Sequence, residues 1–305
     1  MQPFIALLTR LNETWQSLGG LAESLERPPA EVAAWAHRLK EEGYPLELGP
    51  EGYRLAPGTP TPRALKPLLR GTFGQLYRYE GALGSTQDAM RTWAEEGAGE
   101  GALLLAERQE AGRGRQGRVW TSRAGAGLTF SLLLRPRLPL AQLSLLPLAA
   151  GVALVEACGV GGLKWPNDLL APDGRKLAGV LLEAKLGAEG VRYAVLGVGL
   201  NVYPPVPEGA AAVAEYASRS RVELLADLLD RLEARYHQLY HEPEGVLEAY
   251  RAHSLTLGRE VKVTTQQGGL QGQAVGLGPD GALLLKVGGQ IRAIGAGDVQ
   301  LVGQL

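Results

Sequence analysis

The sequence predicts an α+β protein whose middle part forms a mixed β-sheet covered by helices. Three observations support this class. The middle of the chain contains several β-rich apolar runs, helical patterns are interspersed with them, and turn signals between neighbouring runs indicate hairpins rather than a doubly wound sheet. Stretches rich in proline and glycine divide the chain into three parts, and we expect domains at 1–59, 60–256 and 257–305.

The first part is predicted to contain three short helices followed by a hairpin. Helical patterns cover 3–12, 18–26 and 28–43, and the last begins at two prolines and ends at a glycine. Two short strands are expected on either side of the turn at 49–52. This order is typical of a winged helix-turn-helix domain, and a helical cap with a β-flap is the alternative. The run APGTPTP, which cannot continue a helix or a central strand, ends this part.

The other two parts differ in their patterns. In the middle part we expect strands at 102–108, 127–135, 179–184 and 193–202, and helices at 141–158, 221–240 and 245–254. In the last part, short β-rich runs are separated by glycine-rich turns, at 259–265, 269–278, 281–289 and 291–302. Several strands within about 50 residues predict a small SH3-like barrel.

Composition indicates an ordinary globular protein. Hydrophobic residues make up 45% of the 305 residues, charged residues 21%, and the net charge is −1. The sequence contains no uninterrupted apolar stretch of about 18 residues, so we expect no transmembrane helix. The N-terminus lacks the features of a signal peptide. The single cysteine, Cys158, can form no internal disulfide, so we expect a cytoplasmic protein. His237 and His241, four residues apart, are interpreted as the solvated side of a helix rather than a metal site.

A basic, glycine-rich segment, AGRGRQGRVW at 111–120, is the first candidate for chemistry. Residues 107–123 carry five arginines against two glutamates, whereas the whole chain is nearly neutral. Glycines let the backbone approach a ligand, and the arginine fork suits phosphate or carboxylate. The segment therefore predicts a site for a small anionic ligand, with a solvated loop that contacts nucleic acid as the alternative. No P-loop pattern follows it.

A second candidate is the predicted hairpin built from WPNDLLA and KLAGVLLEA, around the turn at 172–174. If Leu170 pairs with Lys176, then Asp168 and Lys176 point from the same face of the sheet. This pair is either a plain cross-strand ion pair or a lysine held to stabilise charge developing on a phosphorus centre. Asn167 and Asp168 would then place a metal or a nucleotide.

Two further segments carry weaker signals. GVGLNV at 197–202 has glycines at 197 and 199, which remove side chains where another group presses on the strand; tight helix–strand packing is the alternative. STQD at 85–88 has the residue types of a helix N-cap, and its free amide groups could also hold an anion.

GRGRQGRVW, KWPNDLL, RKLAGVLLE and GVGLNV, in this order and spacing, resemble the biotin protein ligases (biotin–[acetyl-CoA-carboxylase] ligases). The resemblance covers essentially the whole chain, including the winged helix and the SH3-like domain of the larger members. The conjunction of the motifs is specific, although no single motif is. It implies a central domain with the fold of class II aminoacyl-tRNA synthetases. A lipoate ligase is the nearest enzymatic rival, but the GRGRxGRxW pattern belongs to the biotin branch.

The resemblance also implies which residues form the site. The catalytic residues would be Lys176, Arg113, Arg115 and Asp168. Biotin would contact Ser85, Thr86, Gln87, Gln109, Gly112, Arg113, Gly114, Arg115, Trp120, Lys176, Gly179, Val180 and Leu181. ATP, with Mg²⁺ at its phosphates, would contact Arg115, Arg118, Trp120, Asn167, Asp168, Lys176 and Asn201. Gln87 and Gln116 stand where the family usually has asparagine and arginine, and no lysine or arginine follows Arg292.

The implied reaction has two steps. The biotin carboxylate attacks the α-phosphate of ATP to give biotinyl-5′-adenylate, and cationic side chains offset the repulsion between the two anions. A lysine amine on the carrier domain of acetyl-CoA carboxylase or a related carboxylase then attacks the adenylate, and AMP leaves. Asp168 is the candidate for helping this amine lose its proton, and closure of the arginine loop would exclude water. The resemblance also implies a homodimer.

Some members of the family also repress transcription through their N-terminal domain. In this chain, residues 30–35 of the expected recognition helix offer no arginine, asparagine or glutamine before Arg38. Residues 1–60 carry five basic and eight acidic side chains, a net charge of −3 that repels phosphates. We therefore predict weak DNA binding. A biotin-sensing transcriptional repressor without catalysis is the alternative function, and the intact Lys176 and arginine loop favour the enzyme.

Overall fold

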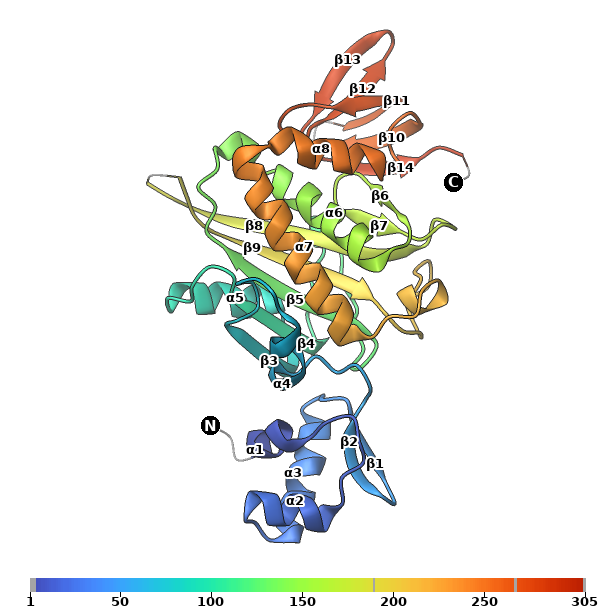
Figure 1. Cartoon of the computed structure of the whole chain (residues 1–305). Coiled ribbons are helices and arrows are strands. Elements are labelled where there is room, and N and C mark those ends of the chain that lie inside the picture. Colours follow the sequence, from blue (N-terminus) through green and yellow to red (C-terminus); the bar gives the residue numbers. More distant parts are fainter. Residues whose placement is uncertain (1–3, 189, 266–267, 304–305) are drawn as a thin grey trace.

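The computed structural model describes residues 4–188, 190–265 and 268–303. Figure 1 shows a small helical unit at the N-terminal end, a large twisted sheet with helices in the middle, and a small β-unit at the C-terminal end. The large sheet contains both parallel and antiparallel neighbours, so the predicted α+β class with a mixed sheet is confirmed.

The N-terminal unit has the predicted element order. Its elements are α1 (Phe4–Arg10), α2 (Leu18–Leu25), α3 (Pro29–Glu41), β1 (Leu46–Gly49) and β2 (Gly52–Leu55). The three helices bury a common apolar stripe that includes Leu7, Val32 and Leu39. Trp35, at the start of the expected recognition helix, is partly buried against the same core, so it is not a free base-reading side chain.

The central sheet has seven strands in the order β3-β4-β5-β9-β8-β7-β6, and only β3 and β4 are parallel neighbours among them. The strands are β3 (Tyr77–Leu83), β4 (Leu103–Gln109), β5 (Gly127–Leu134), β6 (Gly162–Lys164), β7 (Asp168–Leu170), β8 (Lys176–Gly187) and β9 (Gly190–Asn201). The predicted strands and the predicted hairpin of β7 with β8 are confirmed. The two edge strands were not predicted, because β3 contains Glu80 and Gly81, residue types depleted in strands, and β6 has only three residues.

Helices cover the two faces of this sheet unequally. On one face lie α6 (Leu145–Cys158), α7 (Arg221–His241) and α8 (Pro243–Ala252), and on the other lies α5 (Thr86–Glu95). A short helix, α4 (Pro62–Leu65), follows the N-terminal unit. The described residues also form 3₁₀ turns, namely η1 (Lys66–Leu68), η2 (Arg115–Gly117), η3 (Leu140–Gln142) and η4 (Val213–Glu215).

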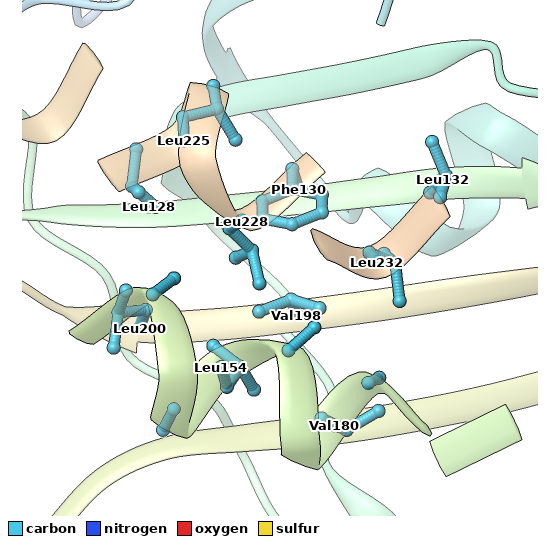
Figure 2. Packing of buried hydrophobic residues seen from close by; sticks show 14 of the residues in the cluster. Leu128, Phe130, Leu132, Leu154, Val180, Val198, Leu200, Leu225, Leu228 and Leu232 are labelled. Atoms are coloured by element: carbon cyan, nitrogen blue, oxygen red, sulfur yellow. The ribbon is translucent and has the colours of Figure 1, made fainter. Parts of the chain in front are cut away.

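Strand alternation explains how each face obtains its core. Phe130 and Leu132 point from β5 toward α7, where Leu228 and Leu232 meet them (Figure 2). Leu133 points from β5 to the opposite face and joins a second cluster with residues of α5. The part of that face beyond α5 carries small and polar residues instead, and this is where the candidate site lies.

Helix α6 with the turn before it, Leu140–Cys158, is long and apolar enough to span a membrane by length and composition, with a mean hydropathy of 1.7. Nearly all of α6 is buried between α7, α8 and the sheet. This packing identifies it as a core helix, and Cys158 at its end is a buried free thiol.

The C-terminal unit is a five-stranded antiparallel sheet in the order β13-β12-β11-β10-β14. Its strands are β10 (Glu260–Thr265), β11 (Gly268–Leu277), β12 (Leu283–Val287), β13 (Gln290–Ile294) and β14 (Asp298–Leu301). The run predicted as one segment at 291–302 is two strands at opposite edges of the sheet. The unit contacts the central part at Gly281, whose carbonyl accepts a 3.0 Å hydrogen bond from Trp165 Nε1.

Candidate active site

A cavity of about 330 Å³ opens on the α5 side of the central sheet. It brings together side chains from α5, the loop between β4 and β5, and strands β7 to β9. The lining includes most of the residues that the sequence analysis selected, namely Thr86, Gln87, Gln109, Arg113, Gly114, Arg115, Arg118, Trp120, Asn167, Asp168, Lys176, Gly179, Val180, Leu181 and Asn201. The other two selected residues, Ser85 and Gly112, lie outside this lining but next to it in the chain.

The floor of the cavity is a row of small and polar residues that crosses four strands. Thr129, Gly199, Gly179 and Asp168 are successive cross-strand partners, so they face the same side of the sheet. A Cβ atom added at Gly199 would lie 2.2 Å from the indole of Trp120. The prediction that another group presses on the GVGLNV strand is thus confirmed, and that group is the Trp120 ring.

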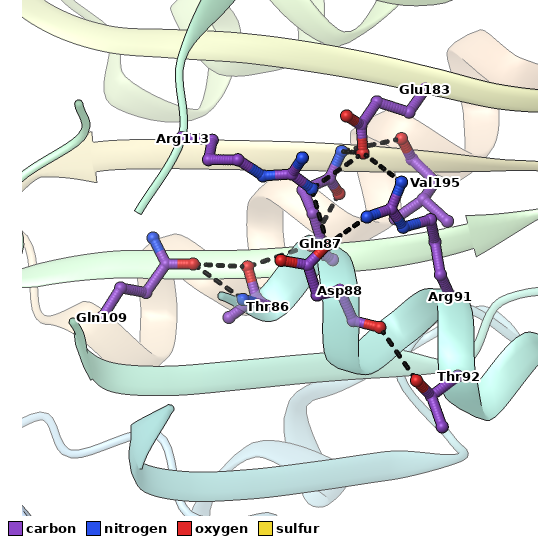
Figure 3. Close-up of polar contacts among 10 residues, drawn as sticks. Thr86, Gln87, Asp88, Arg91, Thr92, Gln109, Arg113, Glu183 and Val195 are labelled. Atoms are coloured by element: carbon purple, nitrogen blue, oxygen red, sulfur yellow. Dashed lines mark hydrogen bonds and ion pairs between the residues drawn. The ribbon is translucent and has the colours of Figure 1, made fainter. Parts of the chain in front are cut away.

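One end of the cavity is formed by the first residues of α5 (Figure 3). The Gln109 side-chain oxygen accepts hydrogen bonds from the Thr86 amide at 2.7 Å and the Thr86 hydroxyl at 3.0 Å. Ser131 donates to the oxygen of Gln87 at 2.8 Å. Ser85 holds the N-cap position, but its buried hydroxyl has no hydrogen-bond partner in the described part of the chain. Such an unpaired buried hydroxyl is available to a ligand.

The arginine loop, residues 110–126, forms a small hairpin over the cavity. The Gly114 amide donates to the Arg118 carbonyl at 2.7 Å, and the Trp120 amide donates to the Gly112 carbonyl at 3.0 Å. A Cβ atom at Gly112 would lie 2.2 Å from the Trp120 carbonyl oxygen, so this position requires glycine.

The first two arginines of this loop have different partners. Arg113 pairs with Asp88 at 2.8 Å and Glu183 at 3.3 Å (Figure 3). Arg115 donates to the side-chain oxygen of Asn167 at 3.0 Å. Burial lowers the pKa of Arg115, with Asp168 acting in the opposite direction. Arg115 is therefore a partly desolvated cation directed at the turn between β6 and β7, whereas Arg113 is paired with two carboxylates. Trp165, Pro166 and Asn167, predicted as part of a strand, form this turn.

The third arginine, Arg118, pairs with Asp298 at the start of β14. Asp298 and Gly297 also line the cavity. The C-terminal unit therefore contributes a carboxylate to the site, which sequence reasoning missed because it searched that unit for a basic residue.

Lys176 and Asp168 lie as the hairpin predicts, with Leu170 paired to Lys176. Lys176 Nζ is 2.6 Å from Asp168 Oδ1, and Lys164 Nζ is 3.1 Å from Asp168 Oδ2. Burial alone would raise the pKa of Asp168, but the Lys176 and Lys164 ammonium groups outweigh it and hold the pKa below its ordinary value. Asp168 is therefore a carboxylate at neutral pH, held between two ammonium groups.

Several other contributors escaped the sequence analysis. Asp88 and Glu183 were missed because acidic residues were not expected around a basic loop, and Ser131 because it lies within an apolar strand. Lys164 was quoted within KWPNDLL, and its spacing of four residues from Asp168 was the available signal. The two histidines interpreted as solvated lie on α7, where the His237 side chain is 62% exposed.

Taken together, the fold and the site define a class. A mixed sheet carries a cavity with a glycine floor, with cations at one end and uncharged hydrogen-bonding groups at the other. This arrangement is suited to an enzyme that holds an elongated ligand by a polar head and activates its anionic end.

Comparisons with known proteins give the family. Residues 83–201 match the Biotin/lipoate A/B protein ligase family, and residues 256–302 match the Biotin protein ligase C terminal domain. The chain is 33% identical over 291 residues to the bifunctional ligase/repressor BirA of Bacillus subtilis, which covers 88% of this chain and 89% of that protein. It is 38% identical over 232 residues to the biotin--[acetyl-CoA-carboxylase] ligase of Mycobacterium tuberculosis, covering 71% and 85% of the two chains.

A solved structure agrees with these matches. The biotin protein ligase from Aquifex aeolicus in complex with biotin and ATP superposes with a TM-score of 0.65 at 31% identity, covering 74% of this chain and 98% of that one. The chain therefore belongs to the biotin protein ligase family, and it is a biotin ligase.

Proposed function

We propose that this cavity binds biotin and ATP, forms biotinyl-5′-adenylate from them, and passes the biotinyl group to a lysine of a carrier domain. The observation that carries the proposal is the placement of Lys176, fixed by Asp168, at the cationic end of a cavity whose other end is lined by Thr86, Gln87 and Gln109. The Aquifex aeolicus ligase, which holds biotin and ATP, supports the identity of both ligands.

Biotin fits the cavity in one direction. Its bicyclic ring is apolar except for a ureido group, which both donates and accepts hydrogen bonds. We place the ureido group at Thr86, beside the buried Ser85 hydroxyl, where Gln87 and Gln109 complete the polar end, and the ring against Leu181. The Val180 side chain, also predicted to contact biotin, points to the opposite face of the sheet and packs in the core with Leu154 (Figure 2), because neighbouring residues of a strand face opposite sides. The valeryl chain would then run beneath the Gly112–Arg115 segment with its carboxylate toward Lys176. Trp120 would cover the chain from above.

In the first step a carboxylate oxygen of biotin attacks the α-phosphorus of ATP, and the bond to pyrophosphate breaks. Negative charge accumulates on the phosphorus oxygens, so preorganised cations lower the barrier. Lys176 and Arg115 supply this charge at the cavity floor, and Arg118 with Asn167 and Asn201 holds the nucleotide. Arg113 was expected to be catalytic, but because it pairs with Asp88 and Glu183 we assign it the role of holding the loop over biotin.

In the second step the ε-amine of the carrier lysine attacks the carbonyl carbon of the adenylate, and AMP leaves. Asp168 was predicted to help this amine lose its proton. We now assign Asp168 a different role, because a carboxylate with a lowered pKa that is shared by Lys164 and Lys176 is a weak base. It orients the Lys176 ammonium and keeps it in place.

The residues present fit a Mg²⁺ ion that arrives with the ATP phosphates. Among the described residues, no group of three or more histidine, cysteine, aspartate or glutamate side chains could hold a metal by itself. Two cavity carboxylates, Asp168 and Asp298, already pair with cations. Mg²⁺ commonly uses one or two carboxylates together with substrate phosphates, and when bound there it would offset phosphate charge.

We propose that the flanking units are a winged helix-turn-helix domain at 1–59 and an SH3-like domain at 257–305, around a catalytic domain at 60–256 with the fold of class II aminoacyl-tRNA synthetases. Their element orders support these assignments. The protein is expected to be cytoplasmic and to dimerise. Two relatives of similar length are named ligase/repressor, but the acidic N-terminal unit favours ligation without strong DNA binding.

The transfer step gives a direct test of this proposal. The protein is incubated with biotin, ATP and Mg²⁺ and a biotin carboxyl carrier domain, and the carrier is weighed by mass spectrometry. We expect one biotinyl group on one lysine, and none when that lysine is replaced by arginine. Absence of the mass increase with wild-type carrier would rule out the proposed function.

A further inference from the structure

A buried ion pair lies beneath the base of the arginine loop. Glu107, on β4, and Arg221, the first residue of α7, have fully buried side chains, and Arg221 Nη2 lies 2.5 Å from Glu107 Oε1. Neither side chain lines the cavity. Burying two charges costs solvation that their attraction repays only partly, so such a pair is weak evidence for a contribution to stability.

Both members of the pair bind the same stretch of backbone. Glu107 Oε2 accepts a hydrogen bond from the Gly125 amide at 2.8 Å, and Arg221 Nε donates to the Gly127 carbonyl at 2.9 Å. The Tyr79 hydroxyl donates to Glu107 Oε1 at 2.7 Å and completes the carboxylate's contacts on that side. The pair thus fixes the returning limb of the arginine loop, which we define as residues 120–127, where it enters β5.

The returning limb carries the ring that covers the cavity floor. Trp120 begins the limb and lies on Gly199, and its ring centroid is 5.8 Å from Lys176 Nζ. The outgoing limb has its own anchors, since the amides of Glu110 and Ala111 donate to carbonyls at the end of β3. The returning limb has further anchors, since Ser122 Oγ accepts a hydrogen bond from the Gln109 amide and the Ala126 carbonyl accepts from the amides of Val202 and Tyr203. The ion pair adds a buried side-chain anchor to the limb that carries the Trp120 ring, and it acts from outside the cavity.

We propose that Glu107 and Arg221 are positioning residues for the ligase reaction, which hold Trp120 and the arginine loop closed over the adenylate. This inference rests on the proposed function. The fork of Arg221 is suited to the task, because one guanidinium reaches both the carboxylate and the Gly127 carbonyl. Burial alone would lower the pKa of Arg221, but the Glu107 carboxylate raises it, so Arg221 keeps its positive charge.

The test removes both charges together. Glu107→Leu with Arg221→Met replaces the pair by apolar side chains of similar size, a change that often leaves stability unaffected. Arg221→Lys is the second variant, because an ammonium keeps the charge but cannot reach both partners in the fork geometry. The matched control is Glu156→Leu with Arg235→Met, an ion pair between α6 and α7 that makes no contact with the loop. Urea unfolding confirms that each variant is folded.

Two readouts separate the anchoring of the loop from its use in ligation. Trypsin cleavage after the loop arginines, without ligands, should be about tenfold faster in the double variant, because both hydrogen bonds from the pair to the loop backbone are lost. Biotinyl-adenylate should escape from the double variant about tenfold faster, whereas kcat for adenylate formation stays near the wild-type value. Arg221→Lys should show smaller changes of the same sign.

Each result is decisive. If trypsin cleaves the folded double variant at the rate of the control, the pair does not anchor the loop. If the double variant fails to fold, the cleavage rate of Arg221→Lys decides the same question. Faster cleavage with unchanged adenylate escape would show that the anchor does not serve the reaction. If wild-type protein forms no adenylate, the proposed function fails, and the proteolysis result still decides whether the pair anchors the loop.

Discussion

Lys176 Nζ and Asp168 Oδ1 lie 2.6 Å apart, and Asp168 is the cross-strand partner of Gly179 on the cavity floor. The carboxylate is also held by Lys164 at 3.1 Å. Asp168 therefore remains paired if Lys176 is removed, and the two residues can be separated experimentally: one supplies charge to the reaction, and the other keeps that charge in place.

Lys176→Ala should leave the fold intact and slow adenylate formation by a factor of about 10² to 10³, the usual effect of removing one preorganised stabilising group, roughly 3–4 kcal/mol. Rapid-quench measurement of a single turnover with biotin and ATP provides the rate. Lys185→Ala is the matched control, since Lys185 lies on the same strand and pairs with exposed Glu95. A Lys176→Ala rate equal to that of the control would remove the lysine from the mechanism.

The role of Asp168 makes a prediction about pH. Its pKa is lowered in the folded protein from an ordinary value of 3.8, so its stabilising effect is complete above that value and is lost as the pH falls through the lower folded-state pKa. Asp168→Asn should therefore reduce the free energy of unfolding at neutral pH. In the variant, this free energy should also decrease less steeply as the pH is lowered into the acid range. Urea titrations of both proteins from neutral pH into acid measure this.

Asp168 should not contribute to the pH dependence of the transfer rate near neutral pH. The rate of transfer to the carrier should show no titration of Asp168 there, because the group stays ionised. A transfer rate that falls with an apparent pKa near neutrality in wild-type protein, and loses that dependence in Asp168→Asn, would restore Asp168 as the base.

Arg115→Gly should release the intermediate. Arg115 connects the tip of the loop to Asn167 by a 3.0 Å hydrogen bond, and its loss detaches the tip from the turn between β6 and β7. Free biotinyl-adenylate would then biotinylate lysines of bystander proteins such as serum albumin. Gln116→Gly is the matched control, because Gln116 has a φ of 55° that glycine adopts without strain. Labelling confined to the carrier in both variants would argue against a retaining role for Arg115.

DNA binding should be weak at physiological salt. Two basic side chains of the N-terminal unit are already paired with carboxylates, Arg38 with Glu42 at 2.6 Å and Arg54 with Glu47 at 2.7 Å. These pairs reduce the charge available to phosphates in a unit that is already acidic. Titration of the full-length protein, with biotin and ATP, against its own promoter fragments should give no specific complex at nanomolar concentration in about 150 mM salt, where specific binders usually form one.

Much of the candidate site could be predicted from the sequence, because KLAG and GVGLNV lie on the regular strands β8 and β9 and the arginine motif has a charge pattern that can be recognised locally. The pairing of Leu170 with Lys176 follows from the turn between them, and it places Lys176 near Asp168. Contacts between distant segments could not be predicted in this way. The pairs of Arg118 with Asp298 and of Glu107 with Arg221 join residues more than a hundred positions apart, and no local pattern encodes them. Edge strand β3 could not be predicted with the same ease because it contains Glu80 and Gly81, residue types that are depleted in strands.

The central claim is that this cavity joins biotin to AMP. Biotin-dependent exchange of labelled pyrophosphate into ATP tests it most directly, because exchange requires reversible formation of the adenylate and needs no carrier. We predict exchange that depends on biotin, is lost in Lys176→Ala, and does not occur with lipoate in place of biotin. Absence of exchange with biotin, or equal exchange with lipoate, would contradict this account.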